Sequence, residues 1–107
     1  MPAQLTLGEV IEKLKTMNPD LEISLKNPHS YRGYYHCLSL EPEINSVSNL
    51  LKECENVLGA YLTGYKGGEF LMTKYTPVYV SFEGTCSGDE LFMIHDDGQY
   101  TSLCNEF

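Results

Sequence analysis

The chain has 107 residues and a formal net charge of −8, because 15 acidic residues outnumber 7 basic ones. A hydrophobic content of 42% and an aromatic content of 11% exclude a disordered chain, and the length predicts a single domain over residues 1–107. The acidic balance excludes a protein that coats nucleic acid by charge alone, because phosphate backbones repel such a surface.

Residues 6–17 are predicted to form an amphipathic helix. A capping box begins at Thr6, and the apolar residues that follow recur at helical spacing. Alternating apolar and polar residues then predict two strands, over residues 21–25 and 34–40. The polar residues 26–30 between these strands predict a loop.

A second amphipathic helix follows, with Ser46 as its expected N-cap and Gly59 as the glycine that ends it. The rest of the chain predicts β structure, in extended segments over residues 60–63, 69–73, 77–82, 91–95 and 99–103. An Asp-Gly turn joins the last two segments, which is a strong hairpin signal. The predicted order is α-β-β-α-β-β-β-β, which counts one strand fewer than these five segments. It describes an α+β fold in which both helices pack on one face of a mostly antiparallel sheet.

Residues 28–36 are the most unusual stretch, with three tyrosines, two histidines and the only arginine of the chain. Tyrosine rings can stack on a base, and the planar fork of arginine suits phosphate or carboxylate. A second turn, over residues 64–69, has similar ingredients in Tyr65, Lys66 and its glycines, although it lacks the spacing of a P-loop. A third loop, over residues 84–89, supplies hydroxyls and an acid that suit a ribose.

If these three loops meet, they form a polar ligand pocket with aromatic walls. The residues expected to bind the ligand are His29, Ser30, Tyr31, Arg32, Gly33, Tyr34, Tyr65, Lys66, Gly67, Gly68 and Asp89. The alternative interpretation is structural. In that case the turns close hairpins, and Arg32 pairs with one of the many carboxylates.

No sequence motif for catalysis is present, so we expect a protein without catalytic residues. No two cysteines have C-x-x-C spacing, and we expect neither a metal site nor a cofactor. A Cys37–His29 pair, a Cys86–His95 pair and a composite metal site with the histidines stay open. The chain has no apolar run of membrane-spanning length and no secretory signal, which predicts a cytoplasmic protein with reduced cysteines and no membrane partner.

Four segments carry a family resemblance: residues 5–11, 29–35, 64–69 and 76–80. The most specific are the His-Ser-Tyr-Arg-Gly-Tyr-Tyr and Gly-Tyr-Lys-Gly-Gly-Glu motifs. On these motifs the chain resembles a group of small accessory proteins encoded by tailed bacteriophages. The resemblance implies a counter-defence protein in the cytoplasm of the infected bacterial host, and it carries over no catalytic residue.

The function that the sequence favours is sequestration of a phosphorylated nucleotide signal made by a host defence enzyme. Arg32 and Lys66 would hold the phosphate, and Asp89 would meet the ribose. The tyrosines expected to stack on the base are Tyr31, Tyr34 and Tyr65.

Two other functions are open. The acidic C-terminal half can dock on the basic nucleic-acid channel of a host nuclease, as an anti-CRISPR-like inhibitor does. The acids that would lead this contact are Glu83, Asp89, Glu90, Asp96 and Asp97. The chain can also be a phage interaction module whose tyrosine-rich loops meet a protein partner. Exposed strand edges would permit a homo-oligomer.

Overall fold

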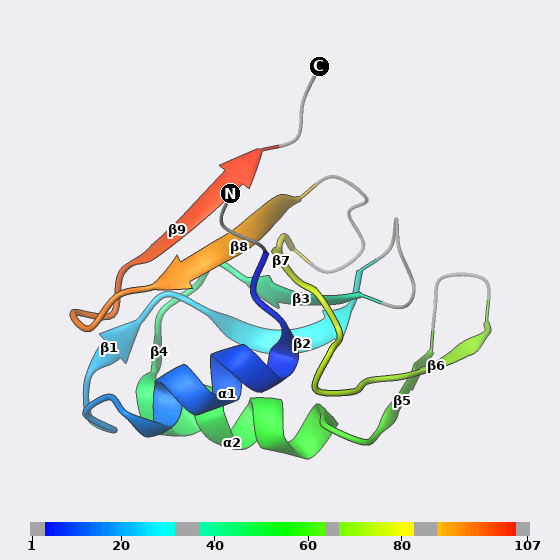
Figure 1. Ribbon diagram of the computed structural model, residues 1–107, viewed down its shortest axis with the longest axis horizontal. Helices are drawn as coiled ribbons and strands as arrows, with labels where there is room; N and C mark the ends of the chain where they lie inside the picture. The colour runs from blue at the N-terminus through cyan, green and yellow to red at the C-terminus, as the bar shows by residue number, and fades with distance from the viewer. Residues whose placement is uncertain (1–3, 32–36, 64–66, 83–87, 105–107) are drawn as a thin grey trace.

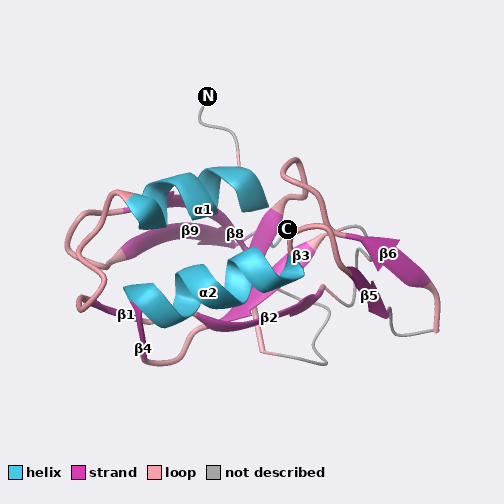
Figure 2. Ribbon diagram, turned by 90° about the horizontal axis from the view of Figure 1, so that it is seen from below, coloured by secondary structure: helices cyan, strands magenta, loops and turns pink. Residues whose placement is uncertain are grey.

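Two helices cover one side of a five-stranded sheet in the computed structural model, which describes residues 4–31, 37–63, 67–82 and 88–104. The elements in chain order are α1 (Leu7–Lys15), β1 (Glu22–Ile23), β2 (Lys26–Ser30), β3 (Leu38–Glu41), β4 (Asn45–Ser46), α2 (Val47–Val57), β5 (Tyr61–Thr63), β6 (Glu69–Leu71), β7 (Val78–Val80), β8 (Asp89–Ile94) and β9 (Tyr100–Cys104). The sheet has the order β2-β3-β7-β8-β9 (Figure 1). Figure 2 shows α1 and α2 next to each other on the same side of it. Neither helix is long and apolar enough to cross a membrane, and the described segments contain no other helix.

Helix α1 begins at the predicted capping box. The Glu9 N–H donates to Thr6 Oγ1 at 3.3 Å, and the Thr6 N–H donates to Glu9 Oε1 at 3.0 Å. The helix ends at Lys15, two residues before the predicted end. Its buried face consists of Leu7, Val10, Ile11 and Leu14. The capping residues and the apolar spacing together account for where this helix begins and which side it buries.

Helix α2 also begins and ends at the residues that the sequence indicated. The Asn49 N–H donates to Ser46 Oγ at 3.3 Å, and Gly59 follows the helix with φ +83°. Cys54 lies on the buried stripe, where burial raises the pKa of its thiol to about 12. Cys54 is therefore a core residue with an unreactive free thiol.

The central sheet is mixed, because one pair of neighbouring strands is parallel. In the β3–β7 pair, Leu38 lies opposite Val78 and Leu40 opposite Val80. The β2–β3, β7–β8 and β8–β9 pairs are antiparallel, so the predicted α+β class and mostly antiparallel sheet are confirmed. The core contains Leu38, Leu40, Val78 and Val80 together with apolar side chains of both helices. Side chains at the alternate strand positions therefore point to the opposite face.

One row of cross-strand neighbours runs over the sheet face opposite the helices, which we call the distal face. His29 pairs in register with Ser39, Ser39 with Tyr79, Tyr79 with Glu90, and Glu90 with Leu103. The row crosses all five strands of the central sheet. It contains a histidine, a hydroxyl, a phenol and a carboxylate, and so gives the distal face its polar character.

Residues 26–30 form strand β2, so the loop predicted there is wrong. Asn27 has φ +52°, and Pro28 has no N–H to donate, and both features are typical of loops. In this chain they lie in an edge strand whose register shifts between Lys26 and His29. An irregular edge tolerates both residues, because no strand in the described part of the chain pairs with its outer side.

Several smaller elements also differ from the prediction. The strand predicted over residues 34–40 is observed from Leu38 as β3, and residues 34–36 lie outside the described part of the chain. The segment 21–25 contributes only the short β1, which pairs with the unpredicted β4. The described order is α-β-β-β-β-α-β-β-β-β-β.

Strands β8 and β9 form the hairpin that the Asp-Gly turn predicts. The His95 N–H donates to the Gln99 carbonyl at 2.7 Å, and the Gly98 N–H donates to the His95 carbonyl at 3.0 Å. Gly98 has φ +88°, and the Asp97 side chain accepts a hydrogen bond from the Gln99 N–H at 3.0 Å. Gly98 therefore supplies the left-handed backbone conformation of this turn, and Asp97 supplies its side-chain hydrogen bond.

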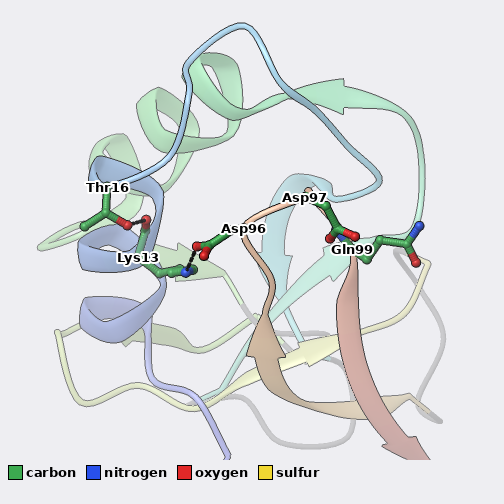
Figure 3. Close-up of polar contacts among 5 residues, drawn as sticks. All are labelled: Lys13, Thr16, Asp96, Asp97 and Gln99. Atoms are coloured by element: carbon green, nitrogen blue, oxygen red, sulfur yellow. Dashed lines mark hydrogen bonds and ion pairs between the residues drawn. The ribbon is translucent and has the colours of Figure 1, made fainter.

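An ion pair ties this turn to α1, since Lys13 Nζ contacts Asp96 Oδ1 (Figure 3). The hydrogen bond and charge of Lys13 lower the pKa of the Asp96 carboxyl below its ordinary value. A carboxyl whose pKa is lowered on folding stabilises the fold above its unfolded pKa and loses that effect as the pH falls through the folded pKa. We expect Lys13→Met to raise the pKa of Asp96 toward its ordinary value in a carbon NMR titration. Lys52→Met, at an exposed position of α2, should leave it unchanged, and an unaltered Asp96 pKa in Lys13→Met would contradict the pairing.

Candidate functional site

Tyr31 and Tyr79 form a stacked aromatic pair. Their ring centroids lie 4.2 Å apart, and the ring planes differ by 17°. Tyr31 directly follows β2, and its N–H donates to the Cys37 carbonyl at 3.0 Å, which ties together the two ends of the β2–β3 connection. Only 3% of Tyr31 is exposed, so its ring anchors this connection and has little free surface on which a base can stack.

The third predicted loop reaches the same place through Gly88. A Cβ atom at Gly88 would lie 3.2 Å from Tyr31 Cε1 and 2.8 Å from Ser81 Cβ. A glycine lets the chain pass this close to the ring and to Ser81. Tyr31, at the start of the β2–β3 connection, therefore lies close to Gly88, at the end of the third loop. We call Tyr31, Tyr79, Ser81 and Gly88 the Tyr31 junction.

A pair of buried hydroxyl groups adjoins the Tyr31 junction. Ser39 Oγ and Ser81 Oγ lie 2.6 Å apart, and both residues are buried. His29, opposite Ser39 in the sheet, is buried as well, and its Nδ1 lies 2.9 Å from the Asn27 carbonyl oxygen. These groups have partners within the protein, as buried polar groups generally do. The Ser39–Ser81 hydrogen bond links β3 to the residue that follows β7, while the His29 ring bonds within its own strand.

Ser30 lies apart from the Tyr31 junction, although it precedes Tyr31 in the chain. It pairs in register with Leu38, a core residue, so alternation places its side chain on the helix side of the sheet. Its Oγ is buried and has no hydrogen-bond partner among the residues that the structure describes. The predicted role of Ser30 as a ligand contact on the distal face therefore has no geometric support.

The Tyr79 hydroxyl of the junction and the neighbouring Cys37 thiol are neutral at physiological pH. Burial raises the pKa of the Tyr79 hydroxyl, and the nearby Cys37 and Glu90 raise it further. Burial also raises the pKa of the Cys37 thiol. Both groups stay protonated and offer hydrogen-bond donors instead of charges. Any positive charge for a bound anion has to come from the flanking loops.

The second predicted turn belongs to the β5–β6 hairpin. Gly67 has φ +91°, and a Cβ atom there would meet no described atom within 4 Å. A Cβ atom at Gly68 would meet the ring of Phe70 at 3.2 Å. Within the described part of the chain, neither glycine contacts the Tyr31 junction. Five of the predicted site residues lie outside the described residues: Arg32, Gly33, Tyr34, Tyr65 and Lys66.

Glu90, and not Asp89, lies on the same face as Tyr79. Strand β8 begins at Asp89, which pairs with the core residue Val80 and is thereby directed to the helix side. The Asp89 carboxylate accepts a hydrogen bond from Ser102 Oγ at 3.3 Å. Sequence reasoning missed both Tyr79 and Glu90 as site residues. The alternation around Val78 and Val80 was the signal for Tyr79, since it places that ring opposite the core.

A large hollow of the described surface lies on the helix side, away from the predicted loops. It is an open groove of about 940 Å³ between the start of α1, the end of α2 and the turn before β7. Its apolar lining residues are Leu5, Ile11, Leu58 and Tyr75. None of the eleven predicted ligand residues lines this groove, so it is a feature separate from the Tyr31 junction.

The described histidines have local structural partners. The His29 ring contacts its own strand at the Asn27 carbonyl, and His95 Nε2 lies 2.8 Å from Thr101 Oγ1 across the β8–β9 hairpin. Among the described residues, no three His, Cys, Asp or Glu side chains come together as a metal site would require. Cys86, one of the cysteines considered for a pair with His95, lies outside these residues.

Comparison of the chain with protein-family models, with curated proteins and with solved structures finds no match. The function therefore has to be argued from the residues and their geometry. The described geometry offers a partly aromatic junction where Gly88 of the third predicted loop approaches Tyr31.

Proposed function

We propose that this chain binds a small phosphorylated nucleotide-type ligand at the Tyr31 junction and does not transform it. The observation that carries the proposal is the contact between Tyr31 and Gly88. Because of this close approach, the segment after Tyr31 and the segment before Gly88 are attached to the same place on the distal face. A ligand bound there is contacted by two loops at once, which is how small-molecule sites are commonly built.

The proposed roles follow from what each side chain can supply. Arg32 comes directly after the anchored Tyr31, and its guanidinium fork suits a phosphate group. Lys66 supplies a second positive charge, and Tyr34 and Tyr65 stack on the base. Because Glu90 lies beside Tyr79, it takes the ribose hydroxyls in place of Asp89.

In this proposal the buried Tyr31–Tyr79 stack fixes where the arginine-bearing loop leaves the sheet. A ligand loses less free energy when the loop that holds it is already ordered at one end. Tyr31 therefore orders the loop, and Tyr34 and Tyr65 contact the base.

The biological role that we propose is counter-defence. Together with the resemblance to tailed-phage accessory proteins, a non-catalytic nucleotide site indicates sequestration of a host signal in the cytoplasm of the infected bacterium. Such a protein hides its ligand stoichiometrically, so one protein site removes one signal molecule. An enzyme would instead turn over many.

The test is native mass spectrometry and calorimetry of the full chain with cyclic dinucleotides, cyclic ADP-ribose-type molecules and linear nucleotides. We expect one ligand class to bind, and Arg32→Ala to weaken binding at least about tenfold, since a charge-assisted hydrogen bond is lost. Lys52→Ala, at an exposed position of α2, removes the same charge elsewhere and should change nothing.

Recovery of the ligand after denaturation of the complex distinguishes sequestration from catalysis. Unchanged ligand supports sequestration, and a processed ligand would show an enzyme. A folded protein that binds no member of the panel contradicts the proposal, as does binding that Arg32→Ala leaves intact.

A further inference from the structure

Strand β9 is an open edge of the central sheet. It is the last strand in the order β2-β3-β7-β8-β9, and Figure 1 shows it as the outermost strand. Within residues 88–104 and the other described segments it pairs with β8 alone. Since His95 and Gln99 bond to each other across the hairpin, alternation turns the main-chain groups of Tyr100 and Ser102 away from β8.

The two edges of this sheet differ in how they are protected. The opposite edge, β2, carries Lys26, Pro28, a positive φ at Asn27 and a shift of register, all of which oppose pairing with another strand. Strand β9 has the sequence Tyr-Thr-Ser-Leu-Cys, with no charge and no proline, and its pairing with β8 shifts register between Leu91 and Met93. Natural edge strands usually carry a charge or a proline as well, so an edge strand without either indicates a strand that receives a partner.

The side chains around β9 define what the partner is. On the distal face, Leu103 is 59% exposed and Met93 of β8 is 52% exposed, so apolar residues suit the partner there. Between residues 88 and 104 the chain has no lysine or arginine, and its acids are Asp89, Glu90, Asp97 and Asp96, the last of which is paired with Lys13 of α1. A second copy would bring the same acids together and be repelled, whereas a basic segment is attracted.

We propose that β9 is the docking edge for an extended, basic segment of a partner protein, which adds to the sheet as a further strand. The main-chain groups of Tyr100 and Ser102 give the pairing, and Leu103 and Met93 give a contact for its apolar residues. Lysine or arginine at alternate positions meets the acids at the two ends of the hairpin. This inference does not depend on ligand binding at the Tyr31 junction.

The test uses the full chain and an eight-residue peptide of alternating valine and lysine, with binding followed by fluorescence anisotropy. We expect saturable binding that weakens with added salt and that protects the Tyr100 and Ser102 amides from hydrogen exchange. Two control peptides separate the contribution of main-chain hydrogen bonds from that of charge. The same peptide with N-methylated main-chain amides should bind at least about tenfold more weakly, and a valine–glutamate peptide should not bind.

Variants of exposed leucines test the location. Leu103→Lys places a positive charge on the distal face beside the edge and should weaken binding of the basic peptide several-fold, while Leu103→Glu should retain it. Leu71→Lys, on the exposed β6 strand, is the matched control and should have no effect. Both positions are at the surface, so the three variants are expected to fold.

Three outcomes overturn the proposal. They are absence of saturable binding, binding that N-methylation or Leu103→Lys leaves unchanged, and a concentration-dependent dimer that itself protects the β9 amides. The last outcome would assign the edge to a second copy of the chain. Arg32→Ala should leave peptide binding intact, so failure of the nucleotide proposal and failure of this one are distinguishable.

Discussion

Replacing Tyr31 by alanine is expected to lower the free energy of unfolding by about 3–5 kcal/mol, the range for removal of a buried aromatic ring. Tyr31 is 3% exposed, stacks on Tyr79 and packs against Gly88. Its loss leaves a cavity and removes the contact that brings two loops together. The measurement is urea unfolding followed by far-ultraviolet circular dichroism.

Tyr61→Ala is the matched control, because Tyr61 is 64% exposed on β5. Its free energy of unfolding should change by no more than about 0.5 kcal/mol, as is usual for surface substitutions. Tyr31→Phe keeps the ring and should retain most of the stability that Tyr31→Ala loses. Equal effects of Tyr31→Ala and Tyr61→Ala would mean that the Tyr31 junction does not hold the fold.

Gly98→Ala is expected to destabilise the protein by about 2–5 kcal/mol, the sum of left-handed backbone strain and steric overlap. Gly98 has φ +88°, and a Cβ atom there would overlap the carbonyl oxygen of Glu22. Because that neighbour is main chain, it cannot move aside as a flexible side chain can. The result would be seen as a lower midpoint of urea unfolding.

Gly67→Ala separates the two contributions to this effect. Gly67 has a similar φ of +91°, but a Cβ atom there meets no described atom within 4 Å. It should therefore cost only the backbone strain, about 1–2 kcal/mol. If both substitutions cost the same, the close approach of the β8–β9 turn to Glu22 is not present in solution.

The local signals of the sequence were sufficient for the helices and for one hairpin. The capping box at Thr6, the cap at Ser46, Gly59 after α2 and the hairpin-turn glycine Gly98 all act within a few residues of the structure that they determine. For such features the nearest neighbours in the chain decide the conformation, so spacing and residue type predict it.

Features that depend on distant segments were missed. The parallel pairing of β3 with β7 joins segments separated by α2, and no local pattern encodes it. Strand β2 was missed because Asn27 and Pro28 favour loops locally, while pairing with β3 holds them in an edge strand. Strand β4 was also missed, because it forms by pairing with β1, which lies before β2 and β3 in the chain.

The ligand site stays a prediction, because several of its residues lie outside the described part of the chain. Within that part, Gly88 approaches Tyr31, while Asp89 is directed to the helix side of the sheet. Strand β8 begins at Asp89, earlier than predicted. Since neighbouring strand residues alternate between faces, that shift brings Glu90 to the distal face and turns Asp89 away from it.

The most direct test of the central claim, ligand binding at the Tyr31 junction, is an amide NMR titration of the full chain with the strongest binder among the nucleotides. We predict that the shifted resonances cluster at Tyr31, Cys37, Gly88 and Glu90, with the helix-side groove around Leu58 and Tyr75 unaffected. Shifts confined to the helix-side groove around Leu58 and Tyr75, or no shifts at all, would contradict the account.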